Sequence, residues 1–128
     1  MATTDLTKPL IAVLEDHEDT RDLWRLSFEQ EFCVQDFQKA SDLLSALERH
    51  RFAAVVADIM MPELDGYDFV KAVRADPRFK NLCIIAVTAL AMTSDRQKAM
   101  EAGFTDFLVK PITPAEIMAV LWRCIKSL

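Results

Sequence analysis

The chain has 128 residues, of which 52% are hydrophobic and 27% charged, a composition typical of one globular domain and not of a disordered or fibrous protein. Its net charge of −5 and pI of about 5.0 show that Lys and Arg are not in surplus. Direct binding of nucleic acid needs such a surplus, so nucleic acid is not expected as a partner. No apolar run approaches the ~20 residues that span a bilayer, and the N-terminus is not a secretory signal. We therefore expect a cytoplasmic protein without membrane insertion.

Short apolar runs alternate with longer amphipathic segments along the chain. The runs are predicted strands and cover residues 10–15, 32–37, 53–58, 83–88 and 106–110. The first, third and fourth are almost continuously apolar, as in parallel strands covered by helices on both faces. The second and fifth are shorter or more polar, as edge strands tend to be. The pattern predicts an α/β fold, a (βα)5 doubly wound parallel sheet forming a single domain over residues 1–128.

Two helices are marked by their ends. A helix over about residues 92–102 is predicted to stop at Gly103, which suits a left-handed cap. In the last helix, Thr113 is the expected N-cap, Pro114 the first helical residue and Glu116 the partner in a capping box. The apolar stripe of that helix comprises Ile117, Met118, Val120, Leu121, Cys124 and Ile125.

Trp122 lies off this stripe, so we expect it to be partly exposed. Two interpretations stay open: surface packing beneath long neighbours, or contact with a partner or second copy.

The three cysteines, Cys33, Cys83 and Cys124, are odd in number and widely spaced. Two lie in strand-like runs and the third lies on the helical stripe. We interpret them as buried free thiols in a reducing cytoplasm, not as a disulfide or a metal site.

Ligands of open parallel sheets bind beyond the carboxyl ends of the strands. Four of the five runs end there in carboxylates, a hydroxyl or an amine: Glu15 and Asp16, Asp58, Thr88, and Lys110. Any one of these is ordinary, because chains return to solvent at strand ends. Their combination predicts one polar cluster at a single edge of the sheet.

The cluster is rich in negative charge. Carboxylates about 4 Å apart repel by roughly 4 kcal/mol per pair at an effective dielectric constant near 20, so three of them favour a bound cation or a proton. Oxygen ligands favour a hard ion such as Mg²⁺. Zinc would need more Cys or His, and only His17 is near, as a solvated loop residue. A carboxylate beside Mg²⁺, with an amine and a hydroxyl, is suited to accept a phosphoryl group.

Several common sites are absent from the sequence. The only two glycines, Gly66 and Gly103, do not follow the first strand, so there is no G-x-G-x-x-G motif or P-loop for a nucleotide. A G-x-S-x-G elbow and a plausible Ser/His/Asp arrangement are also missing.

The motifs "IAVLEDHEDTR", "VVADIMMPELDGYDFV", "IIAVTALA" and "AGFTDFLVKPI" cover essentially the whole chain. Together they resemble the receiver domains of two-component response regulators. The resemblance implies a flavodoxin-like sheet with strand order 2-1-3-4-5. It also implies a phosphoprotein of a phosphorelay, which catalyses only its own phosphoryl transfer and dephosphorylation and is otherwise not an enzyme.

By this resemblance, Asp58 is the phosphoacceptor and its donor is a histidine of a sensor histidine kinase or a histidine phosphotransfer protein. Mg²⁺ (or Mn²⁺) would be bound by Asp16 and Asp58, with the backbone carbonyl of Met60. Glu15 would contact the metal directly or through water, since many relatives carry Asp there.

The resemblance assigns further roles near the last two strands. Thr88 is the switch hydroxyl, and the small Ala89 leaves access for the donor. Lys110 pairs with phosphoryl oxygens, and its bond to Pro111 suits a cis peptide. Phe107 occupies the aromatic switch position, although taken alone it reads as a half-buried aromatic of an edge strand.

Met60 and Leu90 follow Asp58 and Thr88 by two positions, where the family tunes hydrolysis of the aspartyl phosphate. Neither side chain orients a water molecule well, so we predict slow loss of phosphate. An unchanged phosphorylated half-life in Met60→Asn or Leu90→Glu would count against this.

Output is expected through protein contacts, because the chain ends at Leu128 without an effector domain and its initial Met favours a complete gene product. In the family these contacts use the fourth helix, fifth strand and fifth helix. The downstream protein is unknown, and a monomer or a phosphorylation-dependent dimer is expected.

The alternative to a phosphorylation-dependent signalling protein is a receiver-like interaction scaffold that works without phosphorylation. A small α/β enzyme is a third possibility, but no substrate-pocket motif supports it.

Overall fold

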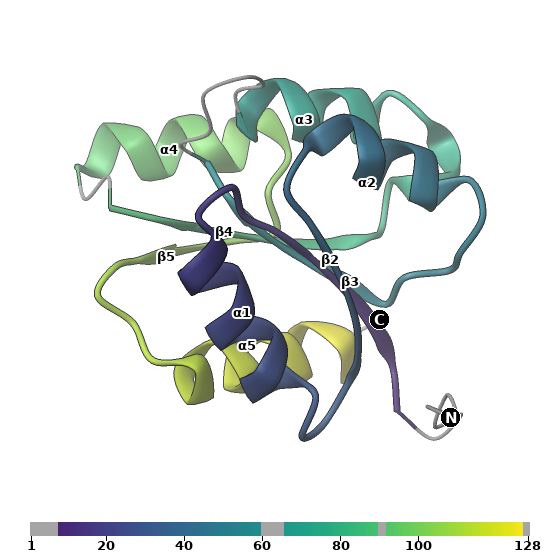
Figure 1. Cartoon of the computed structure of the whole chain (residues 1–128). Helices are drawn as coiled ribbons and strands as arrows, with labels where there is room; N and C mark the ends of the chain where they lie inside the picture. Colours follow the sequence, from purple (N-terminus) through teal and green to yellow (C-terminus); the bar gives the residue numbers. More distant parts are fainter. Residues whose placement is uncertain (1–7, 60–65, 90–91, 127–128) are drawn as a thin grey trace.

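The computed structural model describes residues 8–59, 66–89 and 92–126, which form a five-stranded parallel sheet (Figure 1). The order β2-β1-β3-β4-β5 confirms the predicted fold, with the two more polar runs at the edges. The strands are β1 (Leu10–Leu14), β2 (Cys33–Phe37), β3 (Ala54–Asp58), β4 (Cys83–Thr88) and β5 (Asp106–Val109).

Helices cover both faces of the sheet (Figure 1). One layer holds α2 (Ala40–Leu47), α3 (Gly66–Arg74) and α4 (Thr93–Ala102), and the other holds α1 (Glu18–Phe28) and α5 (Pro114–Lys126). A short 3-10 helix, η1 (Pro77–Phe79), precedes β4. Among the helices described, none has the length and apolar character needed to cross a membrane.

Two hydrophobic clusters fill the space between the sheet and the helical layers. Strand side chains alternate between them, so along β1 Ala12 and Leu14 belong to the α2–α4 side, whereas Ile11 and Val13 belong to the α1–α5 side. This burial on both faces explains why the central strands are continuously apolar.

The predicted end of α4 at Gly103 and the predicted N-cap of α5 at Thr113 are confirmed, whereas the capping box with Glu116 stays a prediction. Gly103 caps α4 with a φ of 125°, a conformation that favours glycine. At the start of α5, the backbone N–H of Glu116 donates to Thr113 Oγ1 at 3.1 Å. In the predicted stripe of α5, four side chains are buried, and Cys124 and Ile125 pack against them partly buried.

The interpretation of all three cysteines as buried free thiols is wrong. Cys83 of β4 and Cys124 of α5 form a disulfide, with their Cα atoms 6.3 Å apart and a sequence separation of 41. Their partnership arises only when α5 packs on the sheet, so neither local pattern could reveal it. Cys33 lies outside this bond and is only partly buried.

Trp122 is partly exposed, as predicted. Its ring stacks on Phe32 at a centroid distance of 4.8 Å, and its indole N–H donates to Glu31 Oε1. Lys126 Nζ lies 5.6 Å from the ring centroid. These contacts match the surface-packing interpretation of Trp122.

Candidate functional site

Parallel pairing brings the carboxyl ends of β1, β3 and β4 to the same edge of the sheet. Leu14 of β1 pairs with Ala57 of β3, and Asp58 pairs with Val87 of β4. Three polar side chains at this edge are nevertheless buried, with exposed fractions of 1% for Glu15, 7% for Asp58 and 0% for Thr88. Burying a polar group without a partner is costly, so we expect other groups of the protein to hold these side chains in place.

Lys110 follows β5 and completes the cluster. Its backbone N–H donates to the Thr88 carbonyl at 2.7 Å, which ties it to the end of β4. Its Nζ lies 3.0 Å from Asp58 Oδ2 and 3.4 Å from Glu15 Oε1. The peptide bond to Pro111 is cis, as the resemblance implied. One ammonium group therefore bridges two buried carboxylates.

The pKa values of two site residues reflect this arrangement. Burial raises the pKa of Glu15 above its ordinary value, and the charge of Asp58 adds to the effect, while the hydrogen bond from the His17 backbone N–H opposes it. Burial lowers the pKa of Lys110, but its hydrogen bond and attraction to Asp58 outweigh that, so the Lys110 pKa is raised overall. The site holds Lys110 charged and disfavours a charged Glu15.

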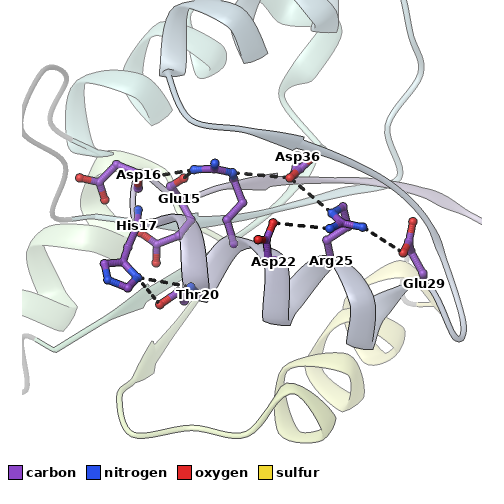
Figure 2. Close-up of polar contacts among 9 residues, drawn as sticks. Glu15, Asp16, His17, Thr20, Asp22, Arg25, Glu29 and Asp36 are labelled. Carbon is purple, nitrogen blue, oxygen red and sulfur yellow. Dashed lines mark hydrogen bonds and ion pairs between the residues drawn. The ribbon is translucent and has the colours of Figure 1, made fainter.

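The β1–α1 turn carries the rest of the acidic group (Figure 2). Asp16 is partly buried, and its side chain also contributes to the raised pKa of Glu15. His17 is exposed, as predicted; its Nδ1 accepts from the Thr20 backbone N–H at 3.3 Å and caps α1. This capping role was not predicted.

The donor chemistry fits a hard cation, because the acidic group has three carboxylates and the ammonium of Lys110 bridges two of them, those of Glu15 and Asp58. Within the described ranges, however, no three His, Cys, Asp or Glu side chains are already arranged to hold a metal ion. The Met60 carbonyl, expected as a further ligand, lies outside the described residues, as does Leu90. The predicted slow loss of phosphate therefore stays a prediction.

The predicted switch residues come from β4 and β5. Thr88 is the last residue of β4, and the Ala89 that follows it is exposed. Phe107 of β5 has an exposed fraction of 4%, less than expected of a half-buried edge-strand aromatic, because it packs in the cluster between the sheet and the α2–α4 layer.

A close approach of α3 holds the end of β3 in place. The Gly66 backbone N–H donates to the Ile59 carbonyl at 3.0 Å. A Cβ added at Gly66 would lie 2.6 Å from Ile59 Cα, closer than real contacts allow. Only glycine fits there, which explains Gly66 in the motif that follows β3. Pro62 was expected to bend the chain and Asp65 to start the helix; both lie outside the described residues.

Two neighbours of the site were missed from the sequence. The ring of Trp24 lies 5.6 Å from Lys110 Nζ. Arg21 donates to the backbone carbonyl of Glu15 at 3.0 Å. The sequence did carry a weak signal for Arg21, since a cation near the start of a helix opposes the helix dipole and indicates a compensating partner.

This chain is similar in sequence to a known protein family and to individual proteins. The profile of the response regulator receiver domain family matches residues 11–121. The "Uncharacterized 14.6 kDa protein in sodA1 3′region" of Leptolyngbya boryana is 40% identical over 112 residues, 87% of this chain and 86% of that protein. Response regulator Rre1 of Synechocystis sp. is 38% identical over 91 residues, 71% of this chain but 39% of that protein. The chain thus spans less than half of Rre1.

Solved structures agree with the fold. The chemotaxis response regulator CheY4 of Vibrio cholerae superposes with a TM-score of 0.85 at 24% identity, covering 91% of this chain and 98% of that chain. The receiver domain of sensor histidine kinase PA1611 from Pseudomonas aeruginosa has a TM-score of 0.84 at 29% identity, covering 93% and 98%. Because the family profile also spans nearly the whole chain, this protein belongs to the response regulator receiver domain family of two-component signalling systems.

Proposed function

We propose that Asp58 accepts a phosphoryl group from a phosphohistidine of a sensor histidine kinase or a histidine phosphotransfer protein. The observation that carries this proposal is the position of Asp58 at the end of β3, largely buried and 3.0 Å from Lys110 Nζ. A carboxylate held beside a fixed cation can receive a group whose oxygens bear negative charge.

In the proposed step, an Asp58 carboxylate oxygen attacks the phosphorus atom. The new O–P bond forms as the N–P bond of the donor breaks, and the leaving imidazole nitrogen keeps the electron pair. Lys110 then exchanges its contact with Asp58 for a phosphoryl oxygen, and the Thr88 hydroxyl moves toward another. The exposed Ala89 leaves the approach to Asp58 open beside β4.

Bound Mg²⁺ (or Mn²⁺) would offset the negative charge of the transferring group. We assign it these oxygen ligands: Glu15, Asp16, Asp58 and the Met60 carbonyl. Support comes from the acidic excess described above and from the PA1611 receiver domain, whose structure has magnesium coordinated in the active-site cleft.

We further propose that the phosphorylated protein changes its contacts through α4, β5 and α5. Phe107 supports this, because it is buried on the α2–α4 side of the sheet and pairs with Ala86, two residues before Thr88 on the neighbouring strand. Movement of Thr88 toward the phosphoryl group would change the space available to the Phe107 ring. The surface of this region carries exposed apolar side chains suited to a protein partner: Met92, Met100 and Val109.

Intact-mass spectrometry tests the phosphoacceptor. The protein is incubated with Mg²⁺ and a small phosphodonor such as phosphoramidate, then measured with and without hydroxylamine. We expect one phosphoryl adduct that hydroxylamine removes, absent in Asp58→Ala and retained in Asp68→Ala, whose carboxylate is exposed on α3.

An adduct that persists in Asp58→Ala would overturn the assignment of the acceptor. No adduct with any donor would instead favour the alternative, a receiver-like scaffold that works without phosphorylation. A chelator should abolish the adduct if the metal is required.

A further inference from the structure

We infer that Arg21 is a positioning residue for the metal-binding turn, holding the backbone from which Glu15 and Asp16 project. This inference rests on the proposed function, because it concerns the same acidic group. It goes beyond the predicted site residues, none of which lies within α1.

The guanidinium of Arg21 reaches back from α1 to the turn before it. Its Nη1 donates to the Glu15 carbonyl at 3.0 Å and lies 3.5 Å from the Asp16 carbonyl. These two carbonyls belong to the peptide units that flank Asp16. Holding both peptide units restricts the directions in which the side chains of the acidic pair can point.

The other end of the guanidinium is anchored to the sheet. Arg21 Nε lies 3.5 Å from Asp36 Oδ2 on β2. Because Asp36 pairs with Val13 in the register of β1 and β2, this anchor lies beside the strand that ends at the acidic pair. Arg21 has an exposed side-chain fraction of only 15%, so its forked group is held in place.

Arg25 provides a natural comparison one turn further along α1. Its Nε also lies near Asp36 Oδ2, at 3.6 Å, and it contacts Asp22 and Glu29 (Figure 2). No contact between Arg25 and the carbonyls of the acidic pair is found among the described residues. The two arginines therefore share an anchor and differ in their contact with the turn.

A binding experiment separates positioning from general stabilisation. Mn²⁺ is titrated into the full chain, its free-ion signal is followed by electron paramagnetic resonance, and Mg²⁺ is then added as competitor. We expect Arg21→Met to weaken metal affinity by about 10–100-fold, as loss of an outer-shell contact does. Arg25→Met should stay within about twofold of the parent, and Arg21→Lys should recover part of the affinity.

The outcomes distinguish the inference from the proposed function. Arg21→Met affinity within about twofold of the parent, or an equal loss in Arg25→Met, overturns the role of Arg21 even if Asp58 is phosphorylated. A parent protein that neither binds metal nor forms the Asp58 adduct overturns both. If Arg21→Met fails to fold, Arg21→Lys decides. It keeps the charge, but its single ammonium cannot match the forked contacts, so its metal affinity should stay below that of the parent. An affinity equal to that of the parent would then overturn the role of Arg21.

Discussion

Lys110 Nζ lies 3.0 Å from Asp58 Oδ2 and, through the same ammonium group, 3.4 Å from Glu15 Oε1. The two carboxylates come from the ends of neighbouring strands, and each is almost entirely buried. Their mutual repulsion is offset by a cation that arrives from the edge strand. The site therefore depends on one lysine for its charge balance before any metal or phosphoryl group is bound.

Lys110→Met should slow phosphorylation of Asp58 by small phosphodonors by about 10²-fold, because it removes a fixed positive charge from the transferring group. The rate of adduct formation in excess Mg²⁺ measures this. Lys80→Met, at an exposed position before β4, serves as the control and should leave the rate unchanged. An undiminished rate in Lys110→Met would show that the lysine does not act on the phosphoryl group.

Glu15→Gln should stabilise the metal-free protein at neutral pH. The pKa of Glu15 is raised in the folded state above the ordinary 4.5, so the folded protein favours the neutral carboxyl group. The folded protein therefore loses stability as the pH rises through this raised pKa. The stability that protonation contributes is fully present below about pH 4.5.

Urea unfolding in a chelator, repeated across this pH range, measures the effect. The difference between Glu15→Gln and the parent should grow as pH rises and vanish toward pH 4.5. A parent that gains stability relative to Glu15→Gln as pH rises would contradict the raised pKa.

Breaking the Cys83–Cys124 disulfide should lower the free energy of unfolding by about 2–4 kcal/mol, because the bond closes a long loop in the unfolded chain. Urea unfolding with and without dithiothreitol measures this. Cys124→Ser should be insensitive to the reductant, whereas Cys33→Ser should respond as the parent does. Equal stability of the parent under both conditions would show that the bond contributes nothing in solution.

Gly66→Ala should destabilise the fold by about 1–3 kcal/mol, since its Cβ would overlap the backbone of Ile59. Ile59 directly follows Asp58, so relief of the overlap would displace the acceptor. We expect a lower urea midpoint together with slower phosphorylation. Ala72→Gly tests the opposite change within α3, and its cost should be limited to the lower helix propensity of glycine. A full phosphorylation rate in Gly66→Ala would show that the contact does not position Asp58.

Much of the fold was predictable because its determinants are local. The apolar runs of β1, β3 and β4 reveal burial on two faces, and Gly103 and Thr113 mark helix ends through backbone conformation and capping. The burial of Phe107 was underestimated, because an edge position in the sheet says nothing about the helix packed above it.

The sequence by itself determined which residues end each strand, and hence that acidic groups, Thr88 and Lys110 follow strands whose carboxyl ends lie at one edge. Only the tertiary structure decided their partners: the bridge from Lys110 to two carboxylates, the contact of Arg21 with the turn, and the bond between Cys83 and Cys124. The reason is physical. Strand and helix patterns arise from near neighbours, whereas side-chain partners are selected by packing between segments far apart in the chain.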